Sequence, residues 1–181
     1  MTHGRRHLMV GVMITGLAGA AWPARAEGVD EQPIPHVRST NASIVALISL
    51  ASQQSKTFRT LVETIAASNG IVYVEKGQCR YGERACLVSV TTSGTYRLLR
   101  VHVETRQAEP DLMGSIGHEL RHTIEVLSDR TVSNSADLYF FYTEMGAAGT
   151  GRSFETRAAV EVGKAIRAEV QNYRKERLSQ P

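Results

Sequence analysis

Residues 110–128 read PDLMGSIGHELRHTIEVLS, and this stretch decides the fold. Its apolar residues recur every three or four positions, which is the spacing of one face of an α-helix. The residues on this face are Ile116, Leu120, Ile124 and Leu127. Pro110 and Asp111 are typical of a helix start. The stretch therefore predicts an amphipathic helix that ends near Ser128.

The polar side of this helix contains the motif His-Glu-x-x-His, at His118, Glu119 and His122. Side chains four residues apart lie on the same side of a helix, so both imidazoles can bind one cation. Zinc fits this pair because it accepts neutral imidazole nitrogens at about 2.0–2.1 Å. Glu119 is turned by about 100° from His118. We therefore predict that Glu119 is no ligand but a general base, which takes a proton from a zinc-bound water.

Two further acids, Glu125 and Asp129, lie within about 40° of His118 at helical pitch and extend the polar face. We expect them to orient the imidazoles through hydrogen bonds, as the partners of metal-binding histidines commonly do. Glu125 is also an alternative ligand. The alternative to a metal site as a whole is a chance match of a short motif on a solvated helix face.

A zinc site needs a third protein ligand, and the other histidines after residue 26 are poor candidates. His36 lies in an expected N-terminal lead-in, and His102 lies within an expected strand. On a final helix expected at residues 153–175, Glu155 is in phase with the apolar stripe. A buried, unpaired carboxylate there would cost on the order of several kcal/mol, and a bound cation would satisfy it. We therefore predict Glu155 as the third ligand, with a salt bridge to Arg121 as the alternative.

The remaining patterns predict a helix, then strands, then further helices. Residues 43–67 have helical apolar spacing with a break near residues 53–55, where Ser55 can cap a second helix. Ser93-Gly94 is a strong hairpin signal between two β-rich runs. Strands are expected at residues 71–74, 87–92 and 96–104, and helices at 134–145 and, after a Gly-rich loop at 146–151, at 153–175. The prediction is an α+β fold, with an N-terminal helix or helix pair, a small antiparallel sheet, the His-Glu-x-x-His helix and a C-terminal helix carrying the third ligand.

Residues 1–26 have the pattern of a signal peptide: a basic start, an apolar run and the small-x-small sequence Ala24-Arg25-Ala26. The run of about fourteen residues is shorter than the ~20 that a membrane-spanning helix needs. We expect cleavage after Ala26 and export to the periplasm or the medium; an uncleaved membrane anchor is the alternative. Residues 27–42 are expected to be a flexible lead-in to a single domain at residues 43–177.

The charge balance argues against nucleic acid and anionic membranes as partners. The chain has 21 Lys and Arg against 18 Asp and Glu, a net charge of +3. Residues 1–26 hold three Arg and no acid, so 18 residues of each sign (21 minus 3, against 18) remain after cleavage. A chain without net charge lacks the basic surface that nucleic acid or an anionic membrane would attract. We expect no nucleic-acid binding and, after signal removal, no stable membrane insertion.

Cys79 and Cys86 are the only two cysteines, and they flank a short polar segment. In an exported protein such a pair is typical of a disulfide that closes a small loop. Two thiols seven residues apart without a neighbouring histidine make a poor ligand set for a metal. We therefore predict a structural disulfide.

The His-Glu-x-x-His helix, followed about thirty residues later by Glu155 with small residues after it, resembles the gluzincin zinc metallopeptidases. The size and the order of elements are similar to those of the small single-domain minigluzincins. The resemblance implies that His118, His122 and Glu155 bind one Zn²⁺, that Glu119 activates water, and that the strand at residues 96–104 holds the substrate as an added strand. Position 159 is Ala, where many gluzincins have an Asp. The candidates for an oxyanion-stabilising donor are Tyr139, Tyr142 and Arg152.

These observations predict an exported zinc metallopeptidase that hydrolyses the peptide bonds of a peptide or protein substrate. Neither a nucleophile elbow nor a phosphate-binding or dinucleotide-binding fingerprint occurs in the sequence. Two alternatives belong to other classes. One is a zinc-binding domain of the bacterial envelope without peptidase activity, and the other is a structural or binding domain in which the motif is accidental.

Overall fold

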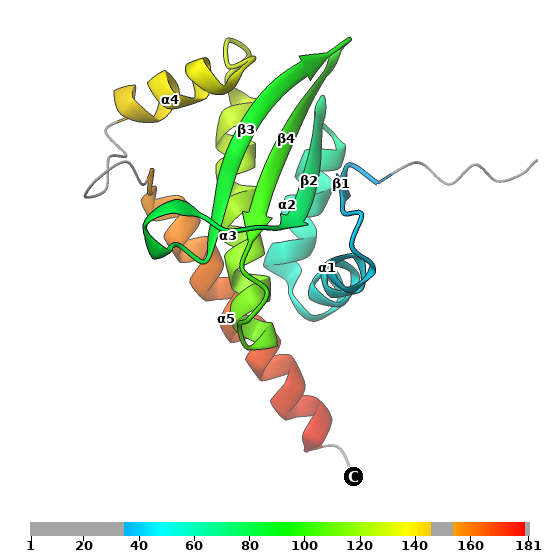
Figure 1. Ribbon diagram of the computed structural model, residues 1–181. Coiled ribbons are helices and arrows are strands. Elements are labelled where there is room, and N and C mark those ends of the chain that lie inside the picture. Colours follow the sequence, from blue (N-terminus) through cyan, green and yellow to red (C-terminus); the bar gives the residue numbers. More distant parts are fainter. Residues whose placement is uncertain (1–34, 146–153, 180–181) are drawn as a thin grey trace, which may run out of the picture. The chain divides into compact units, whose positions relative to one another are not determined.

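The computed structural model describes residues 35–145 and 154–179 of the 181-residue chain. The predicted signal peptide with its cleavage site, the Gly-rich loop at 146–151 and Arg152 lie outside the described residues. Five helices and a four-stranded sheet make up the described part (Figure 1). In chain order they are β1 (Val37–Arg38), α1 (Ala42–Gln54), α2 (Lys56–Ala66), β2 (Gly70–Lys76), β3 (Ala85–Ser93), β4 (Tyr96–Val103), α3 (Glu109–Ser128), α4 (Ser135–Glu144) and α5 (Arg157–Leu178), with a short 3₁₀ turn at Arg80–Gly82 between β2 and β3.

Local signals place most helix starts where the sequence predicts them. The Oγ of Ser55 accepts the backbone N–H of Phe58, so Ser55 caps α2 and separates it from α1. The side chain of Asn134 caps α4 in the same way. The helix that carries the motif begins one residue before Pro110, at Glu109, and its N-cap Ala108 offers no side-chain hydrogen bond. The expected capping by Pro110 and Asp111 is therefore wrong in detail, although Pro110 does lie in the first turn.

The sheet is mixed, which corrects the expected antiparallel sheet. Its strand order is β1-β2-β4-β3, and only β3 and β4 run antiparallel. They form the predicted hairpin, whose turn contains Gly94 at a φ of +60°, a conformation that favours glycine. The chain passes from β2 to β3 through the loop closed by the cysteines, and β4 then returns between them, parallel to β2. As a result β3 is an edge strand and β4 is an inner strand.

The sheet begins earlier in the chain than predicted. Val37–Arg38 forms strand β1, parallel to β2, within the segment expected to be a lead-in. The ring of His36 forms a hydrogen bond with the carbonyl oxygen of Gly70 at 2.7 Å. The ordered part of the domain therefore includes residues that were expected to precede it.

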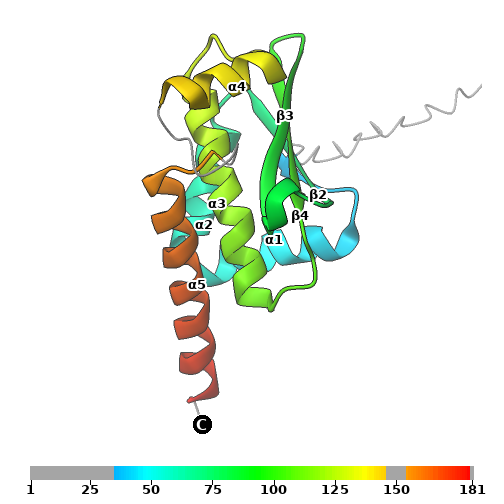
Figure 2. The same cartoon turned by 60° about the vertical axis from the view of Figure 1, so that its left-hand side comes forward.

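The helices pack on one face of the sheet, with α3 between the sheet and α5 (Figure 2). Leu99, Val101 and Val103 of β4 point into this layer and are fully buried, opposite Ile116 and Leu120 of α3. On α3 the predicted apolar residues Ile116 and Leu120 are buried, but Ile124 and Leu127 are only partly so. The polar side of α3 is buried as well, at Glu119, His122 and Thr123. No helix of residues 35–145 and 154–179 has the length and apolarity to span a bilayer.

Glycines bring α3 and α5 into backbone contact. A Cβ atom at Gly163 would lie 3.1 Å from the carbonyl oxygen of Gly114 and 3.3 Å from the Cβ of His118. The two helices run in opposite directions, as the ion pair between Arg174 near the end of α5 and Glu109 at the start of α3 shows. This close antiparallel packing brings the start of α5 next to the motif on α3.

A buried arginine holds the other end of α3. The guanidinium of Arg97, which is 5% exposed, donates hydrogen bonds to the carbonyl oxygens of Val126, Leu127, Asp129 and Val132. The last carbonyls of a helix have no partner within the helix, and a cation there also balances the helix dipole. Arg97 therefore attaches the C-terminal end of α3 to strand β4.

Candidate metal centre

Three potential ligand atoms converge at the middle of α3. The Nε2 atoms of His118 and His122 are 3.2 Å apart, and the Oε1 atom of Glu155 lies 3.0 Å from the first and 3.6 Å from the second. The two imidazoles come from successive turns of α3, as the spacing of the motif predicts. This group could hold a metal ion.

The dimensions of this triangle suit a tetrahedral ion. Ligand atoms at about 2.0–2.1 Å from a tetrahedral centre lie about 3.3–3.4 Å from one another. The three observed separations, 3.0, 3.2 and 3.6 Å, scatter around that edge length. Two neutral imidazole nitrogens at 3.2 Å present lone pairs to each other, which is unfavourable unless a cation or a proton lies between them. A cation bound at the centre, or a proton shared between the two nitrogens, relieves this repulsion.

Glu155 lies beside both imidazoles, but it does not lie on the final helix as predicted. Helix α5 begins at Arg157 and its N-cap is Thr156, so Glu155 precedes the helix instead of lying on it. Its side chain is 45% exposed and is not part of the apolar stripe. The argument from helical phase is therefore wrong, although the residue it selected does lie beside both imidazoles. Arg121, the alternative partner, pairs with Glu125 instead, at 3.4 Å.

Glu125 connects the ligands to one another. Its Oε2 atom lies 3.0 Å from Nδ1 of His122, and its Oε1 atom accepts the hydroxyl of Thr156 at 2.8 Å. In a neutral ring, donation of the Nδ1 proton to Glu125 would leave Nε2 of His122 with a lone pair for a metal ion. Because Thr156 is the neighbour of Glu155, the same carboxylate also fixes the segment that delivers the third ligand. The second predicted partner, Asp129, lies elsewhere: its carboxylate accepts from the backbone and side chain of Thr131 at the end of α3.

Thr156 was missed in the sequence because the final helix was expected to start at residue 153. A threonine whose hydroxyl accepts the N–H of Ala159, three residues later, has the pattern of an N-cap. That pattern could have indicated the true helix start. It would also have separated Glu155 from the helix.

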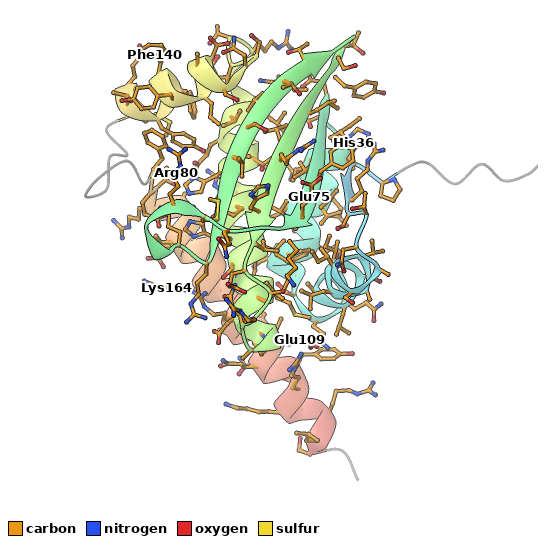
Figure 3. All side chains as sticks on the ribbon, viewed as in Figure 1. His36, Glu75, Arg80, Glu109, Phe140 and Lys164 are labelled. Atoms are coloured by element: carbon orange, nitrogen blue, oxygen red, sulfur yellow. A yellow bond between two sulfur atoms is a disulfide. The ribbon has the colours of Figure 1, made fainter. Side chains whose placement is uncertain are left out.

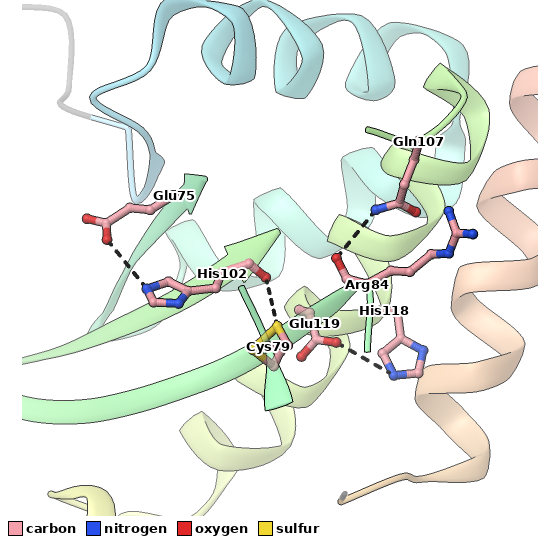
Figure 4. Close-up of a disulfide and its surroundings, with 8 residues drawn as sticks. Glu75, Cys79, Arg84, His102, Gln107, His118 and Glu119 are labelled. Atoms are coloured by element: carbon pink, nitrogen blue, oxygen red, sulfur yellow. Dashed lines mark hydrogen bonds and ion pairs between the residues drawn. A yellow bond between two sulfur atoms is a disulfide. The ribbon is translucent and has the colours of Figure 1, made fainter. Parts of the chain in front are cut away.

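Glu119 lies beside the three ligands without belonging to them. Its side chain is 7% exposed, and Oε1 lies 3.9 Å from Nε2 of His118 (Figure 4). Burial raises the pKa of Glu119 to about 7, while the positive charge of His122 acts in the opposite direction. A carboxyl group with this pKa changes its protonation state near neutral pH, as a general acid and base must.

The two imidazoles have different electrostatic surroundings. Burial and the neighbouring charge of His122 lower the pKa of His118. Burial also disfavours the charged form of His122, but its hydrogen bonds to Glu125 and Glu155 outweigh this effect and raise its pKa to about 9. The pKa of Glu155 is lowered because the two imidazoles outweigh its own partial burial. The surroundings of His122 thus favour a positive charge on its own ring, whereas those of His118 favour the neutral form.

The site lies in the wall of a cavity of about 930 Å³. Residues of α3, α4 and α5 form part of this wall, and the edge strand β3 contributes Ala85, Leu87 and Val88. The strand expected to hold the substrate, residues 96–104, is β4, which pairs on both sides and has no free edge. That expectation is therefore wrong, and β3 takes its place as the strand beside the site.

The predicted disulfide forms another part of the cavity wall. Cys79 and Cys86 are bonded to each other, and the loop between them borders the cavity (Figure 4). These two sulfurs and the carboxylate of Glu83 lie close enough to suggest a second ligand group. Because both sulfurs are committed to the disulfide, that group is not a metal site.

The aromatic candidates for an oxyanion donor have distinct surroundings. The hydroxyl of Tyr142 is buried and donates to the carbonyl oxygen of His122 at 3.2 Å, so its proton is committed to α3, while its ring packs edge-on against the imidazole of His122. Tyr139 lines the cavity and is 50% exposed. Tyr139 is therefore the better candidate of the two. Arg152 lies outside the described residues.

Comparison of the chain with protein-family models, with curated proteins and with solved structures found no match. The similarity to gluzincins therefore stays a prediction from the motif residues. What the site can do has to be argued from its own geometry.

Proposed function

We propose that this protein is a zinc-dependent peptidase with a gluzincin-type active site. The observation that carries the proposal is the convergence of His118, His122 and Glu155 in a cavity wall, with the buried carboxyl group of Glu119 at 3.9 Å from the first imidazole. Ligands and base together are the parts that metal-assisted hydrolysis requires.

The donor set favours zinc over other common ions. Mg²⁺ and Ca²⁺ prefer six or more oxygen ligands, whereas this group offers two imidazole nitrogens and one carboxylate oxygen. Three protein ligands leave the fourth position of a tetrahedral ion open, which is typical of catalytic zinc. A zinc ion bound here would supply a Lewis acid that polarises the scissile carbonyl and makes water more acidic.

The surrounding protein groups orient the proposed ligands and transfer the proton. Glu125 keeps His122 in the tautomer that offers Nε2, and Thr156 keeps Glu155 beside it. Glu119 accepts a proton from the attacking water and returns it to the nitrogen of the leaving amine. The bond between the carbonyl carbon and that nitrogen breaks, and one water molecule is consumed for each peptide bond.

The edge strand gives the substrate a place to bind. Strand β3 lies at the edge of the sheet, and its first residues line the cavity that contains the candidate site. An extended peptide can add to such an edge through main-chain hydrogen bonds, which hold it regardless of its side chains. We infer that β3, and not β4, presents the substrate to Glu119.

Export is part of the proposal. The disulfide between Cys79 and Cys86 is compatible with an oxidising compartment. The substrate would then be a peptide or protein of the periplasm or the medium.

The proposal is tested by metal analysis and peptide digestion of the purified protein. We expect one zinc ion per chain and cleavage of a broad peptide library that a chelator abolishes. Glu119→Gln should retain zinc and lose hydrolysis, because the amide cannot accept the proton. Glu155→Ala should lose zinc, whereas Glu161→Ala, which removes an exposed carboxylate from α5, should keep it.

Each part of the proposal has its own contradicting result. Full zinc content in Glu155→Ala would remove this residue from the ligand set. Undiminished hydrolysis by Glu119→Gln would remove Glu119 as the base. Stoichiometric zinc in a protein that cleaves no peptide of the library would favour a zinc-binding domain without peptidase activity.

A further inference from the structure

The charged groups of the cavity wall outside the metal centre are mostly positive. The loop closed by the disulfide contributes Arg80 and Arg84, and α5 contributes Arg167 (Figure 3 labels Arg80). The only acid of this outer wall within the described residues is Glu83. A ligand that enters the cavity therefore meets an excess of positive charge next to the metal centre.

Arg167 has a defined position close to this centre. It lies one helical turn after Gly163, which packs against His118, so it lies on the face of α5 that is turned toward α3. Its aliphatic stem passes over Gly114: a Cβ at that position would lie 2.6 Å from Cγ of Arg167. Arg167 thus lines the cavity beside Gly114, which lies one helical turn before His118 on α3.

Neither Arg167 nor Arg84 has a charged partner in the part of the chain that the structure describes. Other basic side chains do form such pairs, for example Arg121 with Glu125 and Arg174 with Glu109. Figure 4 shows the side chain of Arg84 extending from the disulfide loop toward α5, on the side of α3 where His118 lies. Two arginines from separate elements therefore offer unused donors to the same region of the cavity.

We propose that Arg167, assisted by Arg84, binds a carboxylate of the substrate and makes this protein selective for peptides with an anionic group near the cleaved bond. The inference rests on the proposed peptidase function. A guanidinium binds a carboxylate through paired, charge-assisted hydrogen bonds. The partial burial of Arg167 strengthens such bonds, whereas Arg84 is exposed and plays the assisting part. The carboxylate can belong to an acidic side chain or to the C-terminus of the peptide, and the experiment distinguishes the two.

The test measures binding with the full-length protein purified as the Glu119→Gln variant, so that bound peptides stay intact. The probes are alanine hexapeptides with an uncharged BODIPY label at the N-terminus and one Glu or one Gln at each position in turn, each made with a free or an amidated C-terminus. Fluorescence anisotropy gives the dissociation constant of each peptide. A preference for Glu over Gln identifies a side-chain carboxylate, and a preference for the free C-terminus identifies the terminal one.

We expect Arg167→Gln to weaken binding of the carboxylate-containing peptides about tenfold or more and to leave the neutral analogues unchanged. Arg84→Gln should cause the same selective loss, and Arg167→Lys should recover part of it. Lys164→Gln is the matched control, because Lys164 lies on the same helix, is 62% exposed and does not line the cavity. Equal losses for charged and neutral peptides, or no loss in Arg167→Gln, would overturn the inference. Selective binding by a protein that cleaves nothing would contradict the peptidase function and leave the carboxylate site standing.

Discussion

Replacement of Thr156 by valine tests whether the third ligand is held in place by its neighbour. Valine has nearly the shape of threonine, so the change removes the hydroxyl and little else. Two interactions are lost: the hydrogen bond to Glu125 at 2.8 Å and the N-cap bond from Ala159 at 3.1 Å. Loss of a helix cap costs about 1 kcal/mol. Loss of one hydrogen bond to the carboxylate of Glu125, which keeps Arg121 and His122 as partners, costs about 1 kcal/mol more.

We therefore expect Thr156→Val to lower the free energy of unfolding of the metal-free protein by about 2 kcal/mol. Removal of a group that orients metal ligands commonly lowers metal affinity about 10–100-fold, and we expect zinc affinity to fall within that range. Urea denaturation with a chelator present measures the first quantity, and competition with a chromophoric chelator measures the second. Thr156→Ser, which keeps the hydroxyl, is the control and should retain most of both. Unchanged zinc affinity in Thr156→Val would refute the argument that Thr156 positions Glu155.

Two of the other predictions concern stability away from the metal centre, and the third concerns zinc affinity. Arg97→Met should lower the free energy of unfolding by about 3 kcal/mol or more, because it leaves several carbonyls at the end of α3 without a partner; urea denaturation measures this, and a loss below about 1 kcal/mol would contradict it. Partial burial raises the pKa of Glu169, but hydrogen bonds from Ser55 and Thr57 outweigh it and hold the pKa below the ordinary 4.5. The hydrogen bonds to ionised Glu169 therefore stabilise the fold above pH 4.5, and this stability is lost as the pH falls through the lower pKa of the folded state. Glu169→Gln should accordingly make the urea midpoint fall less between about pH 6 and about pH 3 than in the wild type. Gly163→Ala should weaken zinc binding in the same chelator competition, because its Cβ would press against His118 and the backbone of α3; wild-type affinity would show that the helices can move apart.

Features set by neighbouring residues could be predicted from the sequence. The spacing of His118 and His122 placed both imidazoles on one side of α3, and Ser55 marked the break between α1 and α2. The hairpin at Gly94 and the disulfide closing a short loop were predicted for similar reasons. In each case the signal lies within about ten residues, where chain geometry leaves few choices.

Features set by distant residues could not be predicted in this way. The parallel pairing of β2 with β4 depends on the path of the chain between them, and no local pattern records which strand lies at the edge. The contact of Thr156 with Glu125, which holds the segment of Glu155 beside the imidazoles, spans 31 residues and leaves no local pattern. Asp129 shares a helix face with the motif but lies at the helix end, where Thr131 engages its carboxylate.

The disulfide loop and the candidate metal ligands lie in different segments of the chain. The bond between Cys79 and Cys86 closes part of the cavity border, yet none of the three ligand residues belongs to the segment that it closes. Reductant would therefore open the loop at the border of the cavity without touching the residues proposed to bind zinc. If the zinc proposal is correct, metal occupancy and substrate preference should respond differently to the redox potential of the surroundings, and zinc binding should not require the disulfide.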